Sequence, residues 1–394
     1  MGFRRVLAGL VAATQLVVPL AGSGRAQTPP TCTWSIGVMG ALSGPAARLG
    51  RPIANGIRLA VDLANRERDL ACALALHVKD SQGDPNQAVP QARELVEDDQ
   101  VVACICGFFS GETLATGSIF DEGGLLMAST GTNRVIDQQG FGTWFRAIAA
   151  DPKQGAATAR YIVDALPAGS VSVVHDNQDY SKGLAKDVAA GVGDRLDGLY
   201  VINPEESDYS AVVAQIKRRN PDVVYFGGYW PQAGMLLRQL REVRVRSVFV
   251  TADGAMHGGL GRPLQGYDGR ARTKAACPCS DPTEIEAAST FVAEYETSFG
   301  ERPRIYAADA FDVTNIAIDA LRGLSGTETL EQVRAHVVSY FDAADGIDGT
   351  VKDYTWNERG ELVADDSDVF IWKWLDRARR FEYVGRVSEL IDQP

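Results

Sequence analysis

The sequence lacks the features that mark membrane-spanning proteins and nucleic-acid-binding proteins. Beyond residue 26 there is no apolar run approaching the ~18 residues that a membrane helix needs. Basic residues are not in excess either, because 39 Lys and Arg face 51 Asp and Glu, giving a formal net charge of −12. We therefore expect neither a membrane-spanning core nor a nucleic-acid partner, which would require a basic face.

Histidine is scarce, and no enzymatic motif is complete. The four histidines have no ligand spacing to a cysteine pair, so no metal site is expected. The loop in residues 36–50 has neither the Gly-Lys-Ser/Thr of a Walker loop nor the glycine spacing of a dinucleotide site, so no nucleotide cofactor is expected. Ser110 lies in GFFSGET instead of a Gly-x-Ser-x-Gly elbow, although His175-Asp176 could serve as a base and its orienter. A hydrolytic enzyme is therefore the less favoured interpretation.

The N-terminus has the pattern of a secretory signal peptide over residues 1–26. Arg4 and Arg5 precede an apolar stretch, and small residues lead up to Ala26. We therefore expect an exported protein. In an exported chain, six cysteines favour disulfides.

One disulfide can be predicted from spacing. Cys32 and Cys72 lie six residues before Val38 and Val78, the predicted ends of the first two strands. If those strands are parallel neighbours, the two cysteines lie side by side. Cys277 and Cys279 could bond to each other or pair elsewhere. The remaining two, Cys104 and Cys106, stay unassigned.

Apolar strands alternate with helical patterns in two successive series, and a chain of this length is expected to form more than one core. The first series has predicted strands at 34–39, 74–79, 101–106 and 125–129. The second has predicted strands at 171–175, 199–202, 223–227 and 247–251. Strands without polar alternation, separated by helices, indicate parallel sheets covered on both faces. The prediction is α/β, with two doubly wound parallel-sheet lobes.

The C-terminal part adds helices and two apolar strands, at 369–374 and 381–384, which we expect to complete both lobes. Lobe one would comprise residues 32–150 and 279–346, and lobe two residues 151–278 and 347–394. Three connections would then join the lobes as a hinge.

Ligands of open parallel sheets bind at the carboxyl ends of strands. In the first lobe these ends carry hydroxyls, notably Ser110 and Thr132. In the second lobe they carry Tyr180, Tyr229, Trp230 and Asp253, listed here in chain order. Hydroxyls and helix N-termini suit a carboxylate, whereas one acid among aromatic walls suits an ammonium group with an apolar body.

Four ordered motifs give the chain a family resemblance: IGVMGALSGP, FDEGGLLMASTGTN, VVHDNQDYSKGLA and YFGGYWPQAGMLLRQLREV. Together they resemble the leucine/isoleucine/valine-binding proteins, type I periplasmic binding proteins that feed ABC transporters. The resemblance runs from about Ser35 to the C-terminal strands. It implies a three-stranded hinge, an amino-acid ligand, a periplasmic location and permease subunits as membrane partners.

The resemblance also implies roles for individual residues. Ser110 and Thr132 match hydroxyls that hold the ligand's α-carboxylate, and Gly131 matches a backbone contact to the head group. Tyr180 and Tyr229 match tyrosines that close over the ligand, and Asp253 matches the acid that pairs with the α-ammonium. Leu49 departs from the family, which has an aromatic ring there.

The ligand expected from these residues is a neutral amino acid, aliphatic or aromatic. The proposed walls are apolar or aromatic and offer no second charge; they are Leu49, Phe108, Tyr180, Tyr229 and Trp230. We expect a monomeric binding protein without a cofactor. A sensor of the same fold, signalling through a receptor instead of delivering to a permease, is the alternative.

Overall fold

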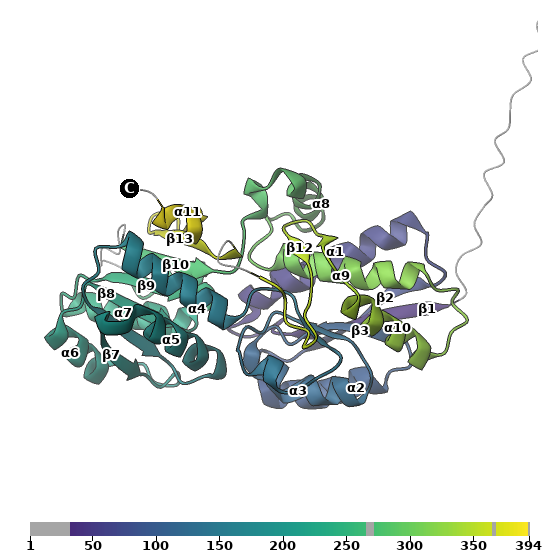
Figure 1. Cartoon of the computed structure of the whole chain (residues 1–394), viewed down its shortest axis with the longest axis horizontal. Helices are drawn as coiled ribbons and strands as arrows, with labels where there is room; N and C mark the ends of the chain where they lie inside the picture. Colours follow the sequence, from purple (N-terminus) through teal and green to yellow (C-terminus); the bar gives the residue numbers. More distant parts are fainter. Residues whose placement is uncertain (1–31, 265–271, 365–367, 393–394) are drawn as a thin grey trace, which may run out of the picture.

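The computed structural model describes residues 32–264, 272–364 and 368–392; the expected signal peptide, residues 1–26, lies outside these ranges. Two lobes lie next to each other, and each has a sheet between layers of helices (Figure 1). The predicted α/β fold with two parallel-sheet lobes is confirmed. Within the described ranges, no helix is both long and apolar enough to cross a membrane.

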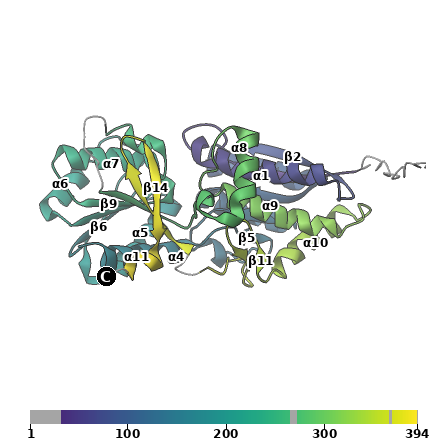
Figure 2. The ribbon, with the colours of Figure 1, turned by 90° about the horizontal axis from the view of Figure 1, so that it is seen from above.

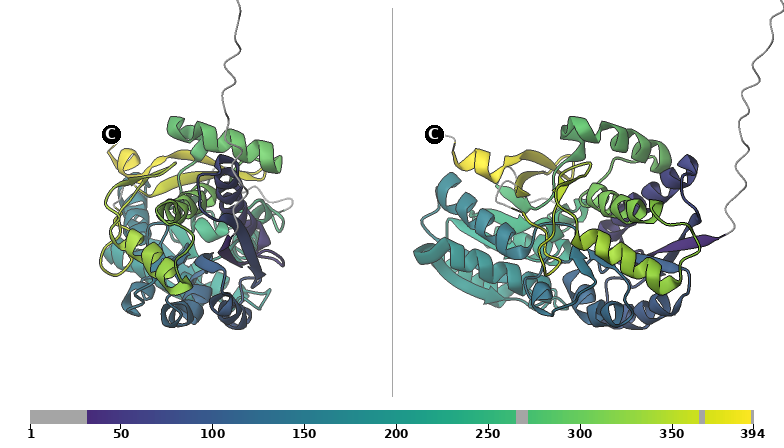
Figure 3. Two further views of the ribbon diagram at one scale, coloured as in Figure 1. Left: turned by 90° about the vertical axis from the view of Figure 1, so that its right-hand side faces the viewer. Right: turned by 45° about the vertical axis from the view of Figure 1, so that its right-hand side comes forward.

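The first lobe contains a five-stranded parallel sheet in the order β2-β1-β3-β4-β5. Its strands are β1 (Thr33–Gly40), β2 (Ala73–Asp80), β3 (Val101–Cys106), β4 (Met127–Ser129) and β5 (Trp144–Arg146). Its helices are α1 (Ala47–Glu67), α2 (Pro85–Glu97), α3 (Ser110–Glu122), α8 (Ser289–Phe299), α9 (Ala307–Arg322) and α10 (Leu330–Asp342). Helices α2 and α3 cover one face, and α1, α9 and α10 cover the other (Figures 1 and 3).

Helix α9 returns from late in the sequence to pack on α1. The approach is close, because a Cβ added at Gly56 of α1 would lie 2.1 Å from the carbonyl oxygen of Ala307. Only glycine fits at that contact. A helix from the C-terminal third of the chain is therefore built into the first lobe's core.

The second lobe contains a seven-stranded sheet in the order β14-β13-β10-β9-β8-β6-β7. Its strands are β6 (Val171–His175), β7 (Leu196–Val201), β8 (Val223–Gly227), β9 (Val248–Ala252), β10 (Thr273–Cys277), β13 (Phe370–Leu375) and β14 (Arg380–Arg386). Its helices are α4 (Asp151–Arg160), α5 (Asp179–Val192), α6 (Ser210–Arg219), α7 (Trp230–Glu242) and α11 (Val387–Ile391). The β13–β14 hairpin is antiparallel and completes one edge.

The described residues on either side of each crossing belong to different lobes at three places along the chain. The first passage leads from β5 to α4, the second from β10 toward α8, and the third from residue 362 to Val369. The sequence-based division gave residues 347–394 to the second lobe. In the structure, residues 347–362, which include β11 (Ile347–Asp348) and β12 (Asp353–Tyr354), pack on the first lobe. The Trp356 indole N–H donates to the Arg146 carbonyl at 2.7 Å, and we propose a lobe boundary after residue 362.

The predicted Cys32–Cys72 disulfide is confirmed, with Cα atoms 4.8 Å apart. Its basis is the parallel register of β1 and β2, in which Val38 is opposite Val78. Cys277 bonds to Cys279, one of the two alternatives left open. The unassigned pair, Cys104 and Cys106, bonds to each other within β3.

Candidate ligand-binding site

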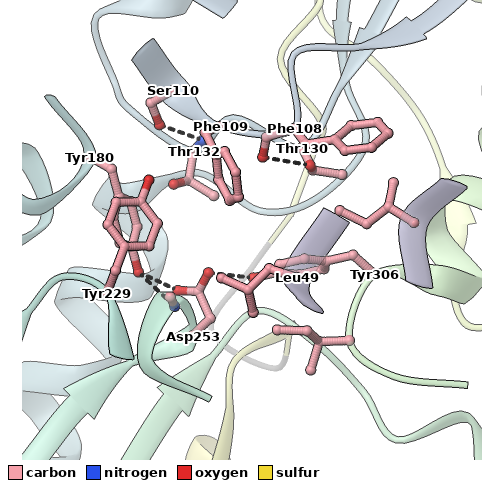
Figure 4. A pocket seen from close by; sticks show the side chains of 13 residues that line it. Leu49, Phe108, Phe109, Ser110, Thr130, Thr132, Tyr180, Tyr229, Asp253 and Tyr306 are labelled. Carbon is pink, nitrogen blue, oxygen red and sulfur yellow. Dashed lines mark hydrogen bonds between the residues drawn. The ribbon is translucent and has the colours of Figure 1, made fainter. Parts of the chain in front are cut away.

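A cavity lies between the lobes, at the carboxyl ends of the strands (Figure 4). The space between its atoms is about 390 Å³. Only about 30 Å³ of this space admits the centre of a water-sized sphere, so the cavity is narrow in this arrangement. The lining residues are Leu49, Ile53, Phe108, Phe109, Ser110, Thr130, Thr132, Tyr180, Tyr229, Asp253, Gly254, Ile305 and Tyr306.

Asp253 provides the negative charge of the cavity. It follows β9 directly and is buried, with 6% of its surface exposed. Its Oδ1 accepts hydrogen bonds from the Tyr180 hydroxyl and from Gln154 Nε2, each at 2.7 Å, and its Oδ2 accepts from the Tyr306 hydroxyl at 2.8 Å. All three donors are neutral. Among the described residues, Asp253 forms no ion pair with a Lys, Arg or His.

The two phenols stay protonated and can keep donating. Burial and then the negative charge of Asp253 hold the pKa of Tyr180 and of Tyr306 well above the usual range. The Tyr180 hydroxyl also accepts a hydrogen bond from the Gly254 N–H at 3.3 Å. Asp253 is therefore fixed in position without being neutralised, which leaves a place for a cation supplied by a ligand.

Hydroxyl groups lie on the opposite side of the cavity (Figure 4). Ser110 begins α3, and its Oγ accepts hydrogen bonds from the backbone N–H groups of Thr132 and Asn133, each at 3.2 Å. Because these bonds use its acceptor sites, the Ser110 proton is available to donate into the cavity. A helix N-terminus carries partial positive charge, so this side suits an anion.

The loop that carries Thr132 is held from below by Arg146. This buried guanidinium donates from Nη1 to the Gly131 carbonyl and from Nη2 to the Asn133 carbonyl, the latter at 3.1 Å. Its Nε donates to Glu361, 2.8 Å away, in the segment that returns to the first lobe. Since Arg146 is fully buried and paired, the loop has a single supported conformation.

Aromatic rings from both lobes close the cavity. The Phe109 ring of the first lobe meets the Tyr229 ring of the second edge-to-face, with centroids 5.5 Å apart. Tyr229 also packs on Tyr180 at 5.2 Å. Asn133 Nδ2 donates to the Asp179 carbonyl at 2.6 Å, another contact between the lobes. These contacts indicate a closed arrangement.

A second carboxyl, that of Asp151, is buried beside the first passage between the lobes. It is fully buried, and neither of its oxygens has a hydrogen bond of good geometry among the described residues, although the Thr132 side chain lies close enough to lower its pKa. Burial raises the pKa of Asp151 to about 8. Thr132 and Arg146 act to lower this pKa, whereas the negative charges of Asp253 and Asp187 raise it further. A neutral carboxylic acid is therefore favoured at this position near pH 7.

The structure brings most of the sequence-predicted site residues together. Those that line the cavity are Leu49, Phe108, Ser110, Thr132, Tyr180, Tyr229 and Asp253. Gly131 does not line it: its carbonyl is bound by Arg146, and a Cβ there would lie 2.6 Å from Thr113 Oγ1. Trp230 does not line it either. Its ring stacks on His257 at 4.7 Å and borders an outer recess.

Sequence reasoning missed Tyr306, Gln154 and Ile305. Tyr306 precedes α9 and has a left-handed backbone, with φ of 65°. This uncommon conformation lets it reach Asp253 from the far side of the cavity. Gln154 lies in α4 and is buried behind Asp253, where it also donates to the Ala276 carbonyl at 2.9 Å.

Comparisons with known proteins agree with this geometry. The leucine-specific-binding protein of Salmonella typhimurium is 28% identical over 345 residues, covering 86% of this chain and 90% of that protein. The branched-chain amino acid transporter substrate-binding protein of Streptococcus pneumoniae, solved with isoleucine, superposes with a TM-score of 0.78 at 21% identity, covering 89% of this chain and 99% of that one. A solute-binding protein of R. palustris, solved with benzoate, superposes with a TM-score of 0.73 at 16% identity, covering 90% and 96%.

These three proteins are described as binding proteins and not as enzymes. The two solved structures have the same fold as this chain. In this chain, the cavity lies between the two lobes of that fold. A family model described as a periplasmic binding protein matches residues 33–365. Since this match covers most of the sequence, the chain belongs to the periplasmic binding protein family.

Proposed function

We propose that the chain is the extracytoplasmic substrate-binding protein of an ABC transporter and captures a neutral amino acid, aliphatic or aromatic. In this proposal residues 1–26 direct export to the periplasm and are removed, and the loaded protein delivers its ligand to permease subunits. One observation carries the proposal. Asp253 lies on one side of the cavity without a protein cation, and hydroxyls lie on the other.

An acid on one side of the cavity and hydroxyls on the other match the ammonium and carboxylate groups of an amino acid. The α-ammonium would bind Asp253, and the α-carboxylate would bind Ser110 and Thr132 near the start of α3. Hydrogen bonds to charged groups contribute about 1.5–3 kcal/mol each. Micromolar affinity corresponds to about −8 kcal/mol, so a few such bonds could supply much of it.

The rest of the cavity selects the side chain. Its apolar lining residues, Leu49, Ile53, Phe108 and Ile305, surround the space away from Asp253. No Lys, Arg or His is among the described residues that line this cavity. Burying an unpaired charge costs several kcal/mol, so Glu, Asp, Lys and Arg would be rejected. Leu49 is smaller than an aromatic ring, which leaves room for phenylalanine beside leucine.

The relatives support the amino-acid class but differ in ligand. The Salmonella relative is named as leucine-specific, and the S. pneumoniae structure holds isoleucine. The R. palustris structure holds benzoate, which has no ammonium group. Asp253 therefore supports an amino acid over an aromatic acid, because a buried carboxylate would repel a ligand that is only anionic.

Two measurements test the proposal. Mass spectrometry of denatured, freshly purified protein should release a neutral amino acid unchanged. A thermal-shift panel of the twenty amino acids should then show stabilisation by leucine, isoleucine, valine or phenylalanine, since a ligand at ~1,000 times its Kd adds about 4 kcal/mol. Stabilisation only by charged amino acids, or only by carboxylates such as benzoate, would contradict it.

A further inference from the structure

A second, larger groove adjoins the candidate site on the side of Leu49 and Ile305, which line both. It carries a strong local charge that differs from the rest of the chain. Six arginines line it: Arg48, Arg262, Arg302, Arg304, Arg379 and Arg380. Among the described residues, the acids that line it are Asp281 and Glu301. A surplus of basic groups here stands out on a protein whose formal net charge is −12.

Within the described residues, four of these arginines form no ion pair. Arg304 pairs with Glu301 at 3.7 Å, and Arg302 pairs with Glu296 at 3.4 Å. The other four have no carboxylate partner within the described residues: Arg48, Arg262, Arg379 and Arg380. The Asp281 carboxylate is already occupied, because it accepts from the Thr283 N–H and hydroxyl at 3.0 and 2.7 Å.

A buried histidine beside these arginines has a ring nitrogen without a hydrogen-bond partner among the described residues. His257 also lines the groove, and only 3% of its surface is exposed. Its Nδ1 accepts a hydrogen bond from the Gly259 N–H at 2.9 Å, so the proton of the neutral ring is assigned to Nε2. That Nε2 is buried and has no hydrogen-bond partner in the described part of the chain. An unpaired buried N–H donor is costly unless a partner binds it.

Besides burial, the positive charges of arginines from both lobes lower the pKa of His257. Its pKa is lowered to about 4 by burial and then by Arg48, Arg304 and Arg262. Arg48 and Arg304 belong to the first lobe, and Arg262 belongs to the second. Seen from above, β14 of the second lobe and α8 of the first both lie on the side toward the viewer (Figure 2). Closure therefore gathers like charges into one groove, which an anion would offset.

We propose that this groove is a binding site for a small oxyanion, phosphate or carboxylate, held between the two lobes. The arginine guanidinium groups match the planar oxygen pairs of such anions, and His257 Nε2–H would supply one further donor. Because both lobes contribute, a bound oxyanion stabilises the closed form. By reciprocal coupling it also tightens binding in the neighbouring amino-acid site.

The test uses the full mature chain and a double variant, Arg48→Gln with Arg262→Gln, which removes one unpaired charge from each lobe. The matched control is Arg218→Gln, an exposed arginine on α6, which does not line the groove. Inorganic phosphate and citrate are titrated separately by calorimetry and thermal shift, with sodium chloride at equal ionic strength as reference. The Arg218→Gln control is needed because phosphate also stabilises proteins in general, by being excluded from their surface, and that effect would be the same in every variant.

We expect saturable phosphate or citrate binding in the wild type and in Arg218→Gln, weakened at least tenfold in the double variant. An equal response of all three proteins, or no saturable binding in the wild type, would overturn the site. Melting curves without anion show whether the double variant is folded. If it is not, each single variant is tested in the same way.

A second measurement tests the link to closure and depends on the proposed function. Saturating phosphate should lower the Kd for leucine in the wild type but not in the double variant. Unchanged leucine affinity, with phosphate binding intact, would overturn the bridging role. Absence of binding of leucine, isoleucine, valine and phenylalanine under all conditions would instead contradict the proposed function, while phosphate binding would still support the oxyanion site.

Discussion

Replacing Asp253 with Asn should separate the charge of the candidate site from its shape. The side chain accepts three hydrogen bonds from neutral donors and has no protein cation beside it. Asn keeps the size and can still accept from Tyr180 or Gln154, and its amide can donate to the Tyr306 hydroxyl oxygen. We therefore expect Asp253→Asn to fold, with a melting temperature near that of the wild type.

The loss in ligand binding should be large. The ligand ammonium would lose the carboxylate of Asp253, which is the one acid among the described residues that line the cavity. Truncating one member of a buried charge pair costs about 2–5 kcal/mol, which corresponds to about 30-fold to 5,000-fold in Kd. Calorimetry with leucine at pH 7 measures this change. Tyr306→Phe is the matched comparison, because it removes one donor to Asp253 and keeps the charge, and its loss should be smaller. Leucine affinity within tenfold of the wild type in Asp253→Asn would refute the assignment.

Three further predictions concern other parts of the molecule. Ser110→Ala and Thr132→Ala should each weaken leucine binding about tenfold or more in calorimetry, because each removes a hydroxyl that faces the ligand carboxylate; unchanged Kd values would move that carboxylate elsewhere. Peptide mapping of non-reduced protein should find Cys32 linked to Cys72 and no free thiol, whereas a free thiol at either position would contradict the β1–β2 register. Between pH 6.5 and 8 the unfolding free energy should fall as pH rises, because the pKa of Asp151 is raised to about 8 and the folded chain holds a proton that the unfolded chain releases. Asp151→Asn should flatten this dependence in denaturant melts at several pH values, and an identical slope in both proteins would contradict the buried neutral acid.

The fold could be predicted from the sequence because its strands are apolar along their whole length. Buried parallel strands such as β6 and β8 have no polar alternation, and helices separate them. The same pattern placed Ser110 and Asp253 at strand ends, where parallel sheets bind ligands. β10 was not predicted, because the short segment TKAAC contains a lysine and no large apolar residue. Its pairing with β9 and β13 is what makes it a strand.

The missed parts of the site depend on contacts between distant segments. Tyr306 reaches Asp253 through a left-handed backbone before α9, and no residue pattern in the sequence indicates this conformation. The attachment of residues 347–362 to the first lobe depends on Glu361 meeting Arg146, 215 residues earlier. Such pairs are decided by tertiary packing, so local propensity and periodicity do not identify them.

The interleaving of the two lobes has a consequence for how the chain acquires its structure during synthesis. The core around β1 contains α9 and Trp356, and the edge of the second sheet is β13 and β14, which end at Arg386. Neither lobe can therefore be finished while the ribosome still holds the last hundred residues. Proteins built from contiguous domains can fold one domain after another as they are made. Here both lobes stay incompletely folded until translation is nearly complete.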